Sequence, residues 1–482
     1  MSEGAEGTVA RATGSGWLET RFHLRENGTT VQTEVMAGLT TFMVMSYIIA
    51  VNPSILNRGG SGLPVREVAT VTCLVAGIMT IAMGLYTNRA LALAPGLGLN
   101  AIVSFTLADQ MGLGFPAAMG VVVTEGVVIT ILVLLGIRQY VMDAVPLVLK
   151  KAISVGIGFF ILFIGLVDAG LITFILPSEG ITGTTGSLLS LSPLNTWPIF
   201  VTLLGLTITI VLYARGVKGA ILIGIVASTI IAFLVPGNVA TWPDNPFAGP
   251  NFSLIGNVSF DYWSKLGFLT AVLVVFSLML ADFFDTMGTL VGVGSEAGYL
   301  DENGNFPDAN KPLLIDSLAA AAGGLMSASS ATTYVESASG VAVGGRTGLV
   351  SVVTGVLFLI ALPFVNLVQA VPQAATAPAL IFVGFLMVGV LTERETMTAD
   401  GKVIRTRGID FNNIEEGLPI VLTMLLMPLT FSITNGIGAG FVSYVLVKLA
   451  RGKARDVHPG VYLVALAFLI YFLRFALFNA KF

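Results

Sequence analysis

Two aspartates lie in a stretch of the chain that is otherwise apolar. Asp282 and Asp285 occur in ADFFDTMGTL (281–290), directly after the uncharged segment LGFLTAVLVVFSLML (266–280). A charge at the centre of a membrane-spanning helix costs about 3 kcal/mol or more, so it is retained where it has a role. Asp282, Asp285 and Thr289 are spaced i, i+3 and i+7, which places them on one helix face. We therefore expect this face to point into the protein and not towards lipid.

A third acid and a side-chain amide lie at two interruptions of apolar segments. In LALAPGLGLNAIVSF (91–105), a proline and two glycines, Gly98 among them, precede a short apolar helix that Asn100 opens. In SSATTYVESASGVAVGG (329–345), the β-favouring ATTYV precedes a short helix that Glu336 opens. A broken helix exposes backbone N–H groups that can hold a polar or anionic group. Unpaired backbone at membrane depth is tolerated only beside a cavity filled with water or ligand.

The three acids favour proton exchange as well as ligand binding. Because like charges in a low-dielectric interior oppose one another, at least one of Asp282, Asp285 and Glu336 is expected to carry a proton in some state of the cycle. The two histidines, His23 and His458, lie outside the predicted spans, so a proton relay has to use carboxylates. A sodium ion held by the same oxygens stays open as an alternative.

Each of these residues also has a structural alternative. The acids could bond to neighbouring hydroxyl or backbone groups and hold helices together. The glycines and Pro95 could simply kink packed helices. Tyr334, in the second interruption, could line the same cavity or pack as an aromatic ring.

The composition places the chain in a membrane. Of its 482 residues, 55% are hydrophobic and 11% are charged, and the mean hydropathy is +0.89. Soluble domains carry about 25% charged residues. The net charge of −4 and the absence of a large basic patch argue against a nucleic-acid partner. The single cysteine, Cys73, excludes an internal disulfide and is expected to be a packing residue.

Apolar segments long enough to cross a bilayer of about 30 Å recur along the chain. They are 32–56, 67–87, 115–137, 147–173, 196–214, 217–236, 264–292, 312–328, 346–371, 375–391, 416–432 and 434–450. With the interrupted stretches 96–109 and 336–343, they predict an all-α polytopic membrane protein with about fourteen transmembrane segments. The predicted outer loops 174–195 and 237–261 contain no Lys or Arg, which places the N-terminal segment 1–31 in the cytoplasm.

The two interruptions indicate an internal repeat. Asn100 and Glu336 are 236 residues apart, and the same offset places the aspartate-bearing span opposite 32–56. Two halves of about seven spans each, an odd number, must be inverted in the membrane. Paired breaks in inverted halves are the strongest sequence indication of a transporter's binding site near the midplane. The apolar tail 459–478 lies outside both halves and is expected to form an interfacial helix.

Five stretches carry a family resemblance: TEVMAGLTTFMVMSYIIAVNPSIL (33–56), APGLGLNA (94–101), FFDTMGTL (283–290), TTYVESASGV (332–341) and GGRTGL (344–349). Together they resemble the AzgA-like branch of the nucleobase–ascorbate and xanthine/uracil permease superfamily, the hypoxanthine, guanine and adenine permeases. The resemblance covers nearly the whole chain.

This resemblance implies a UraA-type fold, in which two inverted seven-span repeats form a core domain that moves against a gate domain. Each of the two broken half-helices would follow a short extended strand. The core would comprise 32–138 and 262–371, the gate 147–236 and 375–451, and the C-terminal segment 452–482. Members are similar to proton symporters of the cell membrane that work as homodimers through the gate. No enzyme activity, metal or cofactor is implied.

The resemblance also implies roles for site residues. Asp285 and Glu336 match the acids that hold the nucleobase and accept from its N–H donors. Asn100 and Gly98 match third-segment positions of the purine branch, and Asp282 matches an additional acid of that branch. These residues would bind the substrate, and the three acids would couple its movement to protons.

Other functions agree less well with the sequence. Thr289 stands where the uracil permeases place a histidine, which argues for a purine and leaves the proton on an acid. Anion carriers of the same fold need a positively charged site, and intramembrane aspartyl proteases carry a GxGD pattern that is absent here. A channel would not cluster ionisable residues at the midplane. A sodium-coupled carrier, or another nucleobase or small-anion carrier of the same fold, is the remaining alternative.

Overall fold

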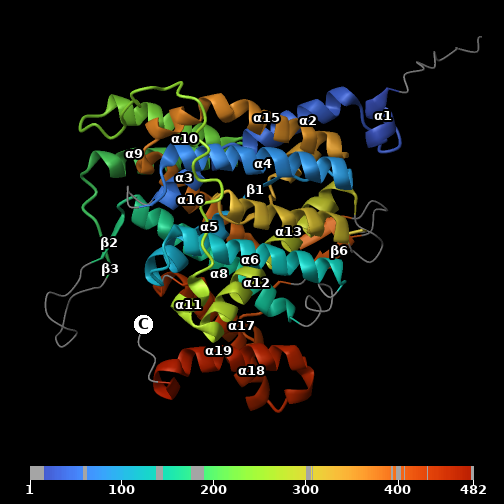
Figure 1. The fold of residues 1–482 in the computed structure, drawn as a ribbon, viewed down its shortest axis with the longest axis vertical. Coiled ribbons are helices and arrows are strands. Elements are labelled where there is room, and N and C mark those ends of the chain that lie inside the picture. Colours follow the sequence, from blue (N-terminus) through green and yellow to red (C-terminus); the bar gives the residue numbers. More distant parts are fainter. Residues whose placement is uncertain are drawn as a thin grey trace, which may run out of the picture.

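The computed structural model describes residues 16–57, 62–136, 145–174, 189–299, 306, 308–391, 394–397, 403–406, 408–430 and 432–478. Its regular structure is almost entirely helical (Figure 1). The helices are α1 (Trp17–Phe22), α2 (Val31–Met45), α3 (Ile48–Asn57), α4 (Val65–Thr87), α5 (Leu97–Ala101), α6 (Phe115–Leu134), α8 (Leu147–Asp168), α9 (Trp197–Ala214), α10 (Ala220–Leu234), α11 (Tyr262–Leu266), α12 (Phe268–Ala297), α13 (Asn310–Leu325), α14 (Ser337–Val341), α15 (Gly348–Ala361), α16 (Gln373–Val388), α17 (Ile414–Leu429), α18 (Ile433–Ala450) and α19 (Pro459–Phe478).

Shorter elements connect these helices. A π-helical segment, Ile102–Gln110, follows α5, and 3₁₀ segments occupy Leu362–Ala370, Gly389–Leu391 and Ala454–Asp456. The strands are β1 (Leu93–Pro95), β2 (Ile172–Phe174), β3 (Leu189–Leu191), β4 (Ala331–Thr333), β5 (Arg394–Met397) and β6 (Val403–Thr406). Residues 1–15 of the predicted N-terminal segment, the predicted core boundary at 138 and residues 479–482 lie outside the described residues.

Eight helices in the described part of the chain are long and apolar enough to cross a membrane. They are Val31–Asn57, which contains α2 and α3, Val65–Thr87, Phe115–Leu134, Leu147–Asp168, Trp197–Ala214, Phe268–Gly294, Gly348–Ala370 and Ile433–Ala450. Shorter apolar helices occur at Ala220–Leu234, Gln373–Val388 and Pro459–Leu473. The predicted polytopic helical protein is confirmed. The total of about fourteen crossings stays a prediction.

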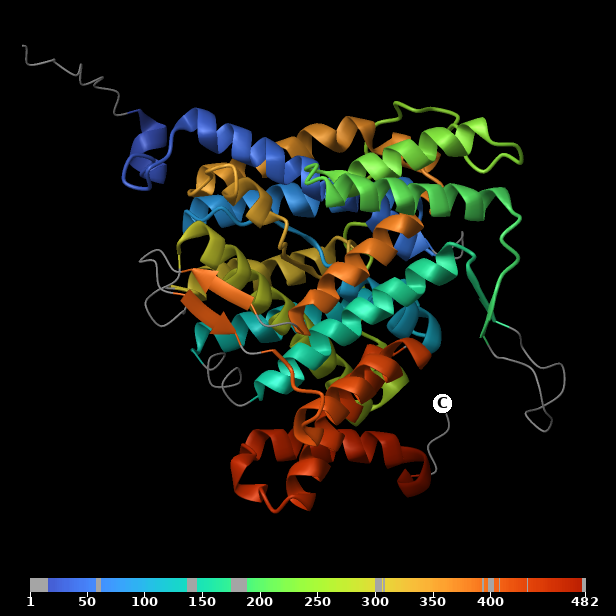
Figure 2. The ribbon, with the colours of Figure 1, turned by 180° about the vertical axis from the view of Figure 1, so that it is seen from behind.

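The long helices pack in two groups. In the first, α4 packs on α15 and α13, α2 on α15, and α6 on α13. In the second, α8 packs on α16, α17 and α18, and α9 packs on α10 and α16. We call these the crossing group (α2–α6 and α12–α15) and the flanking group (α8–α10 and α16–α18). Figure 2 shows α8 between α16 and α17.

Glycines allow neighbouring helices within each group to approach closely. A Cβ atom on Gly84 of α4 would lie 2.3 Å from the carbonyl oxygen of Gly348 of α15. In the flanking group, a Cβ atom on Gly384 of α16 would lie 2.5 Å from the carbonyl oxygen of Gly158 of α8. Small residues at such contacts are typical of helices in membranes, where close packing takes the place of a hydrophobic driving force.

The two predicted breaks meet inside the crossing group. Strand β1 leads into α5 and strand β4 leads into α14, and the two strands pair antiparallel. The register pairs Leu93 with Thr333, Ala94 with Thr332 and Pro95 with Ala331. The sequence-based expectation of two broken half-helices, each preceded by a short extended strand, is therefore confirmed.

Hydroxyl side chains satisfy the irregular backbone that leads into β1. Ser351 Oγ accepts from the Leu91 N–H (2.9 Å), and Ser337 Oγ accepts from the Ala92 N–H (3.0 Å). Thr80 Oγ1 accepts from the Leu93 N–H at 2.9 Å. An unpaired backbone N–H in a bilayer costs several kcal/mol. Helices α4, α14 and α15 therefore supply the acceptors that a continuous helix would have supplied for itself.

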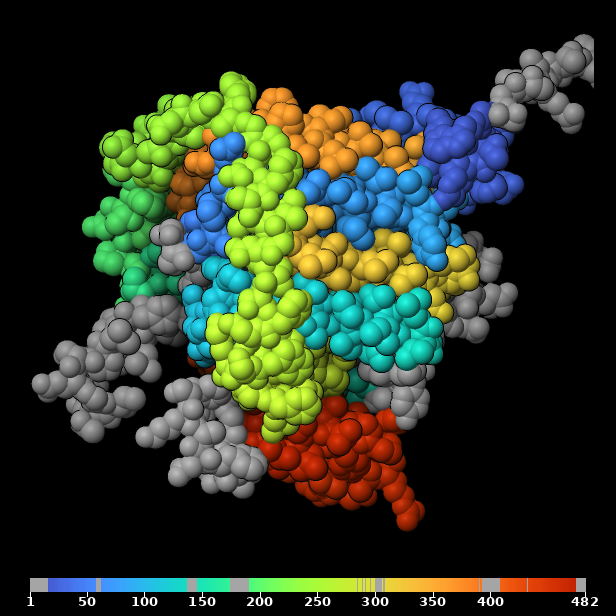
Figure 3. Space-filling model, viewed as in Figure 1, coloured from blue at the N-terminus to red at the C-terminus, as the bar shows by residue number. Residues whose placement is uncertain are grey.

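A long segment between α10 and α12 is fastened to the crossing group. We call residues 245–261 the strap, drawn in yellow-green across the visible face in Figure 3. Arg66 Nε donates to the Gly249 carbonyl (3.0 Å), and the Asn251 amide donates to Glu67 Oε1 (2.6 Å). Further along, the Gly256 N–H donates to the Leu325 carbonyl at 2.8 Å. Helices α4 and α13 thus hold the strap along its length.

The C-terminal helix α19 lies against α18 (Figure 1). Val461, Ala465 and Phe468 are buried, and the Phe468 ring packs on Phe441 of α18 at 6.2 Å between centroids. The opposite face exposes apolar side chains, including Leu463 and others one turn apart. An interfacial helix usually presents a polar face. The predicted interfacial position of 459–478 stays a prediction.

One carboxylate joins α17 to the end of α18. Glu415 Oε2 lies 2.7 Å from Lys448 Nζ, and its Oε1 lies 3.0 Å from Arg451 Nη1 and 2.6 Å from Lys453 Nζ. Glu415 precedes the apolar part of α17. Hydrogen bonds from Lys448 and Lys453 lower the pKa of this carboxyl to about 2.

We expect Glu415→Gln to lower the midpoint of thermal unfolding in detergent at pH 6, because three cations lose their shared anion. A carboxyl whose pKa is lowered by folding stabilises the protein above its unfolded pKa, near 4.5, and ceases to do so as the pH falls through about 2. The difference between wild type and variant should therefore narrow below pH 4.5. Glu416→Gln, the neighbouring substitution, is the control. A difference that stays constant down to pH 3 would contradict this account.

Candidate binding site between two broken helices

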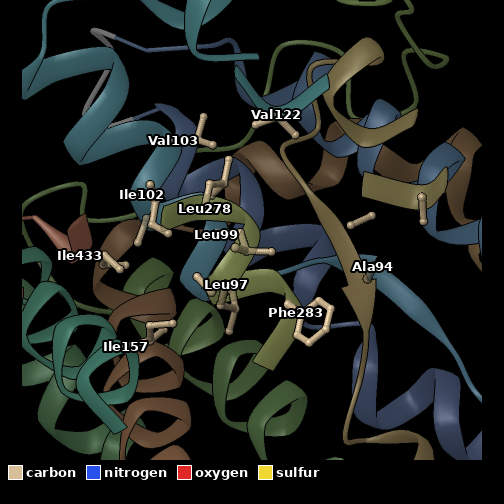
Figure 4. Close-up of a cluster of buried hydrophobic side chains, with 14 of the residues drawn as sticks. Ala94, Leu97, Leu99, Ile102, Val103, Val122, Ile157, Leu278, Phe283 and Ile433 are labelled. Atoms are coloured by element: carbon tan, nitrogen blue, oxygen red, sulfur yellow. The ribbon is translucent and has the colours of Figure 1, made fainter. Parts of the chain in front are cut away.

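The acids of α12 occupy the face that the spacing predicts. Asp282 is fully buried, with 0% of its surface exposed, and Thr289 is also buried. Asp285, one turn after Asp282, retains part of its accessible surface. The face that carries these three residues therefore points into the protein. Figure 4 shows Leu278 and Phe283 of the same helix among the apolar side chains that surround α5.

Glu336 comes from the opposite break and approaches the α12 acids. It lies directly before α14, three residues after β4, and is also only partly buried. Asp285 and Glu336 are close enough to interact electrostatically. The structure thus brings together two carboxylates that lie on different elements, and both retain accessible surface in the interior of a helical membrane protein.

Tyr47 contacts Glu336 and was missed by sequence reasoning. It lies in the turn between α2 and α3, it is 1% exposed, and its hydroxyl donates to Glu336 Oε1 at 2.6 Å. Tyr47 also lies within electrostatic range of Asp285 and Tyr334. The repeat offset could have indicated it, because a shift of 236 residues places position 47 opposite Phe283, next to Asp282.

Tyr334 joins the two strands. Its side chain is buried, and its hydroxyl donates to the carbonyl oxygen of Pro95 at 2.5 Å. This bond connects the end of β4 to the end of β1, while the ring remains within electrostatic range of Asp285 and Glu336. Tyr334 therefore serves the geometry of the strand pair through its hydroxyl, in addition to bordering the two acids.

Asn100 and Gly98 lie on the short helix α5. Asn100 is fully buried, and neither of its side-chain polar atoms has a hydrogen-bond partner within the described protein. Gly98 faces the flanking group, because a Cβ atom on it would lie 2.3 Å from Ile157 Cγ2 of α8. Ile157, Leu97 and Leu99 appear in the same apolar cluster in Figure 4. Gly98 thus permits contact between the two groups, and Asn100 offers an unused donor and acceptor.

Asp316 is a further buried acid that the sequence reasoning did not single out. It lies on α13, and its Oδ1 accepts from both the N–H and the hydroxyl of Thr333, each at 2.8 Å. Its Oδ2 accepts from the hydroxyl of Thr286 at 2.7 Å. Thr286 follows Asp285 directly, and Thr333 precedes Glu336 by three residues. Asp316 therefore joins the elements that carry the other two acids.

The arrangement suits a small, flat, polar molecule. Asp285 and Glu336 offer carboxylate oxygens as acceptors for N–H donors, and Asn100 offers an amide with a donor and an acceptor. In a desolvated site each such pairing contributes to selectivity, because a missing partner leaves a buried group unsatisfied at a cost of about 1–3 kcal/mol.

Comparison with known proteins gives the family. Over residues 32–406 the sequence matches a family described as a permease family. The chain belongs to this permease family. The permease is 39% identical over 462 residues to the adenine permease AdeQ of Escherichia coli, which covers 94% of this chain and 96% of AdeQ. It is 37% identical over 461 residues to the guanine/hypoxanthine permease PbuO of Bacillus subtilis, which covers 93% of this chain and 99% of PbuO.

These relatives confirm the resemblance to the AzgA-like branch. They are permeases, so the expectation that the chain is not an enzyme is confirmed and the aspartyl-protease alternative is set aside. Among solved structures, the permease resembles the transmembrane domain of a cyanobacterial bicarbonate transporter, BicA, with a TM-score of 0.60 at 18% identity. That match covers 85% of this chain and 97% of the BicA domain. It shows the fold alone, and it agrees with the predicted UraA-type architecture.

We expect Asp316→Ala to destabilise the permease and to loosen β4. The substitution leaves the Thr333 N–H and the hydroxyls of Thr333 and Thr286 without their acceptor, at about 1–3 kcal/mol for each buried donor left unsatisfied. The measurements are the midpoint of thermal unfolding and the hydrogen–deuterium exchange of a peptide that contains 331–336. Asp316→Asn retains one oxygen and should fall between wild type and the alanine variant.

Ser317→Ala is the matched control for this prediction. Ser317 is buried on the same helix, but its hydroxyl donates to the Leu314 carbonyl within α13. Equal unfolding midpoints and equal exchange for Asp316→Ala and Ser317→Ala would show that Asp316 does not hold the strand.

Proposed function

We propose that this permease takes up purine nucleobases, namely hypoxanthine, guanine or adenine, in symport with protons. The observation that carries the proposal is the proximity of Asp285, on α12, to Glu336, which follows β4. The relatives named as adenine and guanine/hypoxanthine permeases support the substrate class. Asn100, Gly98, Asp282, Thr289 and Tyr334 complete the proposed site.

The chemistry of a purine matches this set of side chains. A purine is a flat, neutral ring with N–H donors and ring-nitrogen acceptors on its edges. The carboxylates of Asp285 and Glu336 accept from the donors, and the Asn100 amide serves an acceptor. Thr289, buried on the Asp282 face of α12, leaves no basic side chain at the position where uracil permeases place a histidine.

The number of acids that lie close together supports proton coupling. Asp285 lies within electrostatic range of Asp316 and Glu336, and Asp282 is buried one turn away on α12. Several negative charges in a low-dielectric interior oppose one another unless a proton or a cation balances them. A proton that binds to Asp282, Asp285 or Glu336 together with the substrate provides this balance. Sodium coupling is the alternative, and it is an outcome of the test below.

We further propose that transport uses movement of a core domain against a gate domain. The core, residues 32–138 and 262–371, contains the crossing group, and the gate, 147–236 and 375–451, contains the flanking group. The separate packing of the two groups supports this division. The gate forms a homodimer in the cell membrane, with the N-terminus in the cytoplasm. Gly98 against Ile157 is one point of sliding contact between the two domains.

A small-anion carrier of the same fold is the second candidate. The similarity to the bicarbonate transporter BicA favours it on the fold. The site argues against it, because Asp285, Glu336 and Asp316 lie near one another and would repel an anion whenever they are ionised. We therefore rank purine transport first.

We expect proteoliposomes that contain the permease to take up labelled hypoxanthine faster under an imposed inward proton gradient than at equal pH on both sides. Unlabelled guanine and adenine should compete, whereas uracil and bicarbonate should not. The measurement is initial uptake in sodium-free buffer. Uptake that requires sodium and does not respond to the pH gradient would show that sodium, not the proton, is the coupling ion. Uptake of bicarbonate but not of hypoxanthine would contradict the proposed substrate.

We expect Glu336→Gln to reduce hypoxanthine binding at least tenfold, because the amide offers an N–H donor where the substrate needs an acceptor. Glu296→Gln is the matched control, since Glu296 is exposed at the far end of α12. Size-exclusion chromatography checks that both variants remain folded. An unchanged affinity for Glu336→Gln would assign Glu336 a structural role.

A further inference from the structure

We propose that Tyr47 determines selectivity among purines, because its hydrogen bond to Oε1 of Glu336 takes up part of the accepting capacity that a second substrate donor would use. This inference rests on the proposed function, since it concerns which purine the same site prefers. Tyr47 lies far from Glu336 in the sequence and comes from the opposite inverted half. Its contribution becomes visible only where the α2–α3 turn meets the start of α14.

The contact is short and its geometry is fixed. The Tyr47 hydroxyl donates to Glu336 Oε1 at 2.6 Å, which is at the short end of the range for an O–H donor on an oxygen acceptor. The ring cannot swing away freely, because Tyr47 is 1% exposed and its neighbour Ile48 is fully buried. Helix α14 in turn packs on α2. The phenol therefore occupies the Oε1 side of the carboxylate in a defined orientation.

A carboxylate with two free oxygens binds paired donors best. It accepts two parallel N–H groups at once, as in its pairing with the arginine fork. Guanine presents such a pair, the ring N1–H beside the exocyclic amino group. Hypoxanthine presents the same ring N–H without the amino group. Because the Tyr47 hydroxyl already donates to Oε1, Glu336 has Oε2 and only the remaining lone pair of Oε1 for the substrate. The wild-type site thus gains little from the second donor of guanine.

Tyr262 provides a comparison outside the proposed site. It is also fully buried, but its hydroxyl donates to Thr124 Oγ1 of α6 at 2.7 Å. Removal of this hydroxyl leaves the contact between Tyr47 and Glu336 in place. Tyr262→Phe therefore controls for the loss of a buried phenol.

The test compares the dissociation constants of hypoxanthine and guanine for purified wild type, Tyr47→Phe and Tyr262→Phe. Tyr47→Phe retains the ring and removes the hydrogen bond to Oε1, so the ratio of guanine affinity to hypoxanthine affinity should rise about tenfold, the value of one charge-assisted hydrogen bond. The ratio for Tyr262→Phe should equal that of wild type. In the Glu336→Gln background, Tyr47→Phe should add no further change to the ratio.

An unchanged ratio in folded Tyr47→Phe protein would overturn the proposal, and so would the same rise in Tyr262→Phe. Size-exclusion chromatography and the unfolding midpoint establish folding independently of ligand. If wild type binds neither purine, the proposed function fails instead, and this result is distinguishable from an unchanged ratio. A rise that persists in the Glu336→Gln background would show that Tyr47 acts through another group.

Discussion

The structure depends on one pairing, that of two three-residue strands inside a bundle of membrane-spanning helices. Backbone that leaves a helix at this depth must find partners within the protein. Strands β1 and β4 find them in each other, and the residues before β1 find them in hydroxyls of α4, α14 and α15. Because the strands pair antiparallel, α5 and α14 leave this short pair at its two opposite ends, and the residues proposed for the site lie on both of them.

The acids of the site are positioned by groups that are not themselves free to bind a substrate. The oxygens of Asp316 accept from Thr286 and Thr333, and the Tyr47 hydroxyl donates to Glu336. Side chains held by packing and by such bonds lose little further freedom when a ligand arrives, so less of the binding free energy is used for ordering. This arrangement explains how a small neutral ring could be bound without a metal or a strong charge of its own.

The helix faces and the helix breaks could largely be predicted from local sequence pattern. The apolar run with Asp282 and Asp285 indicates an inward helix face, and proline, glycine and β-favouring residues indicate the breaks. Tyr47 and Asp316 could not be predicted in the same way. A single tyrosine or aspartate among apolar residues has no partner at helical spacing, and its role arises only when other segments converge on it. The π-helical turn after α5 has no sequence signal of its own either.

The connection from α10 to the strap is held at two nearby points, Trp242 and Asn245. On its near side, Trp242 stacks on Phe233 of α10 with ring centroids 5.0 Å apart. At the first residue of the strap, the Asn245 carbonyl accepts from the side-chain amide of Asn366, which follows α15. In the proposed movement of one helix group against the other, only the run from Pro243 to Asp244 lies between these two contacts. The length of this run therefore limits how far the two groups could be displaced while both the Trp242 and the Asn245 contacts persist.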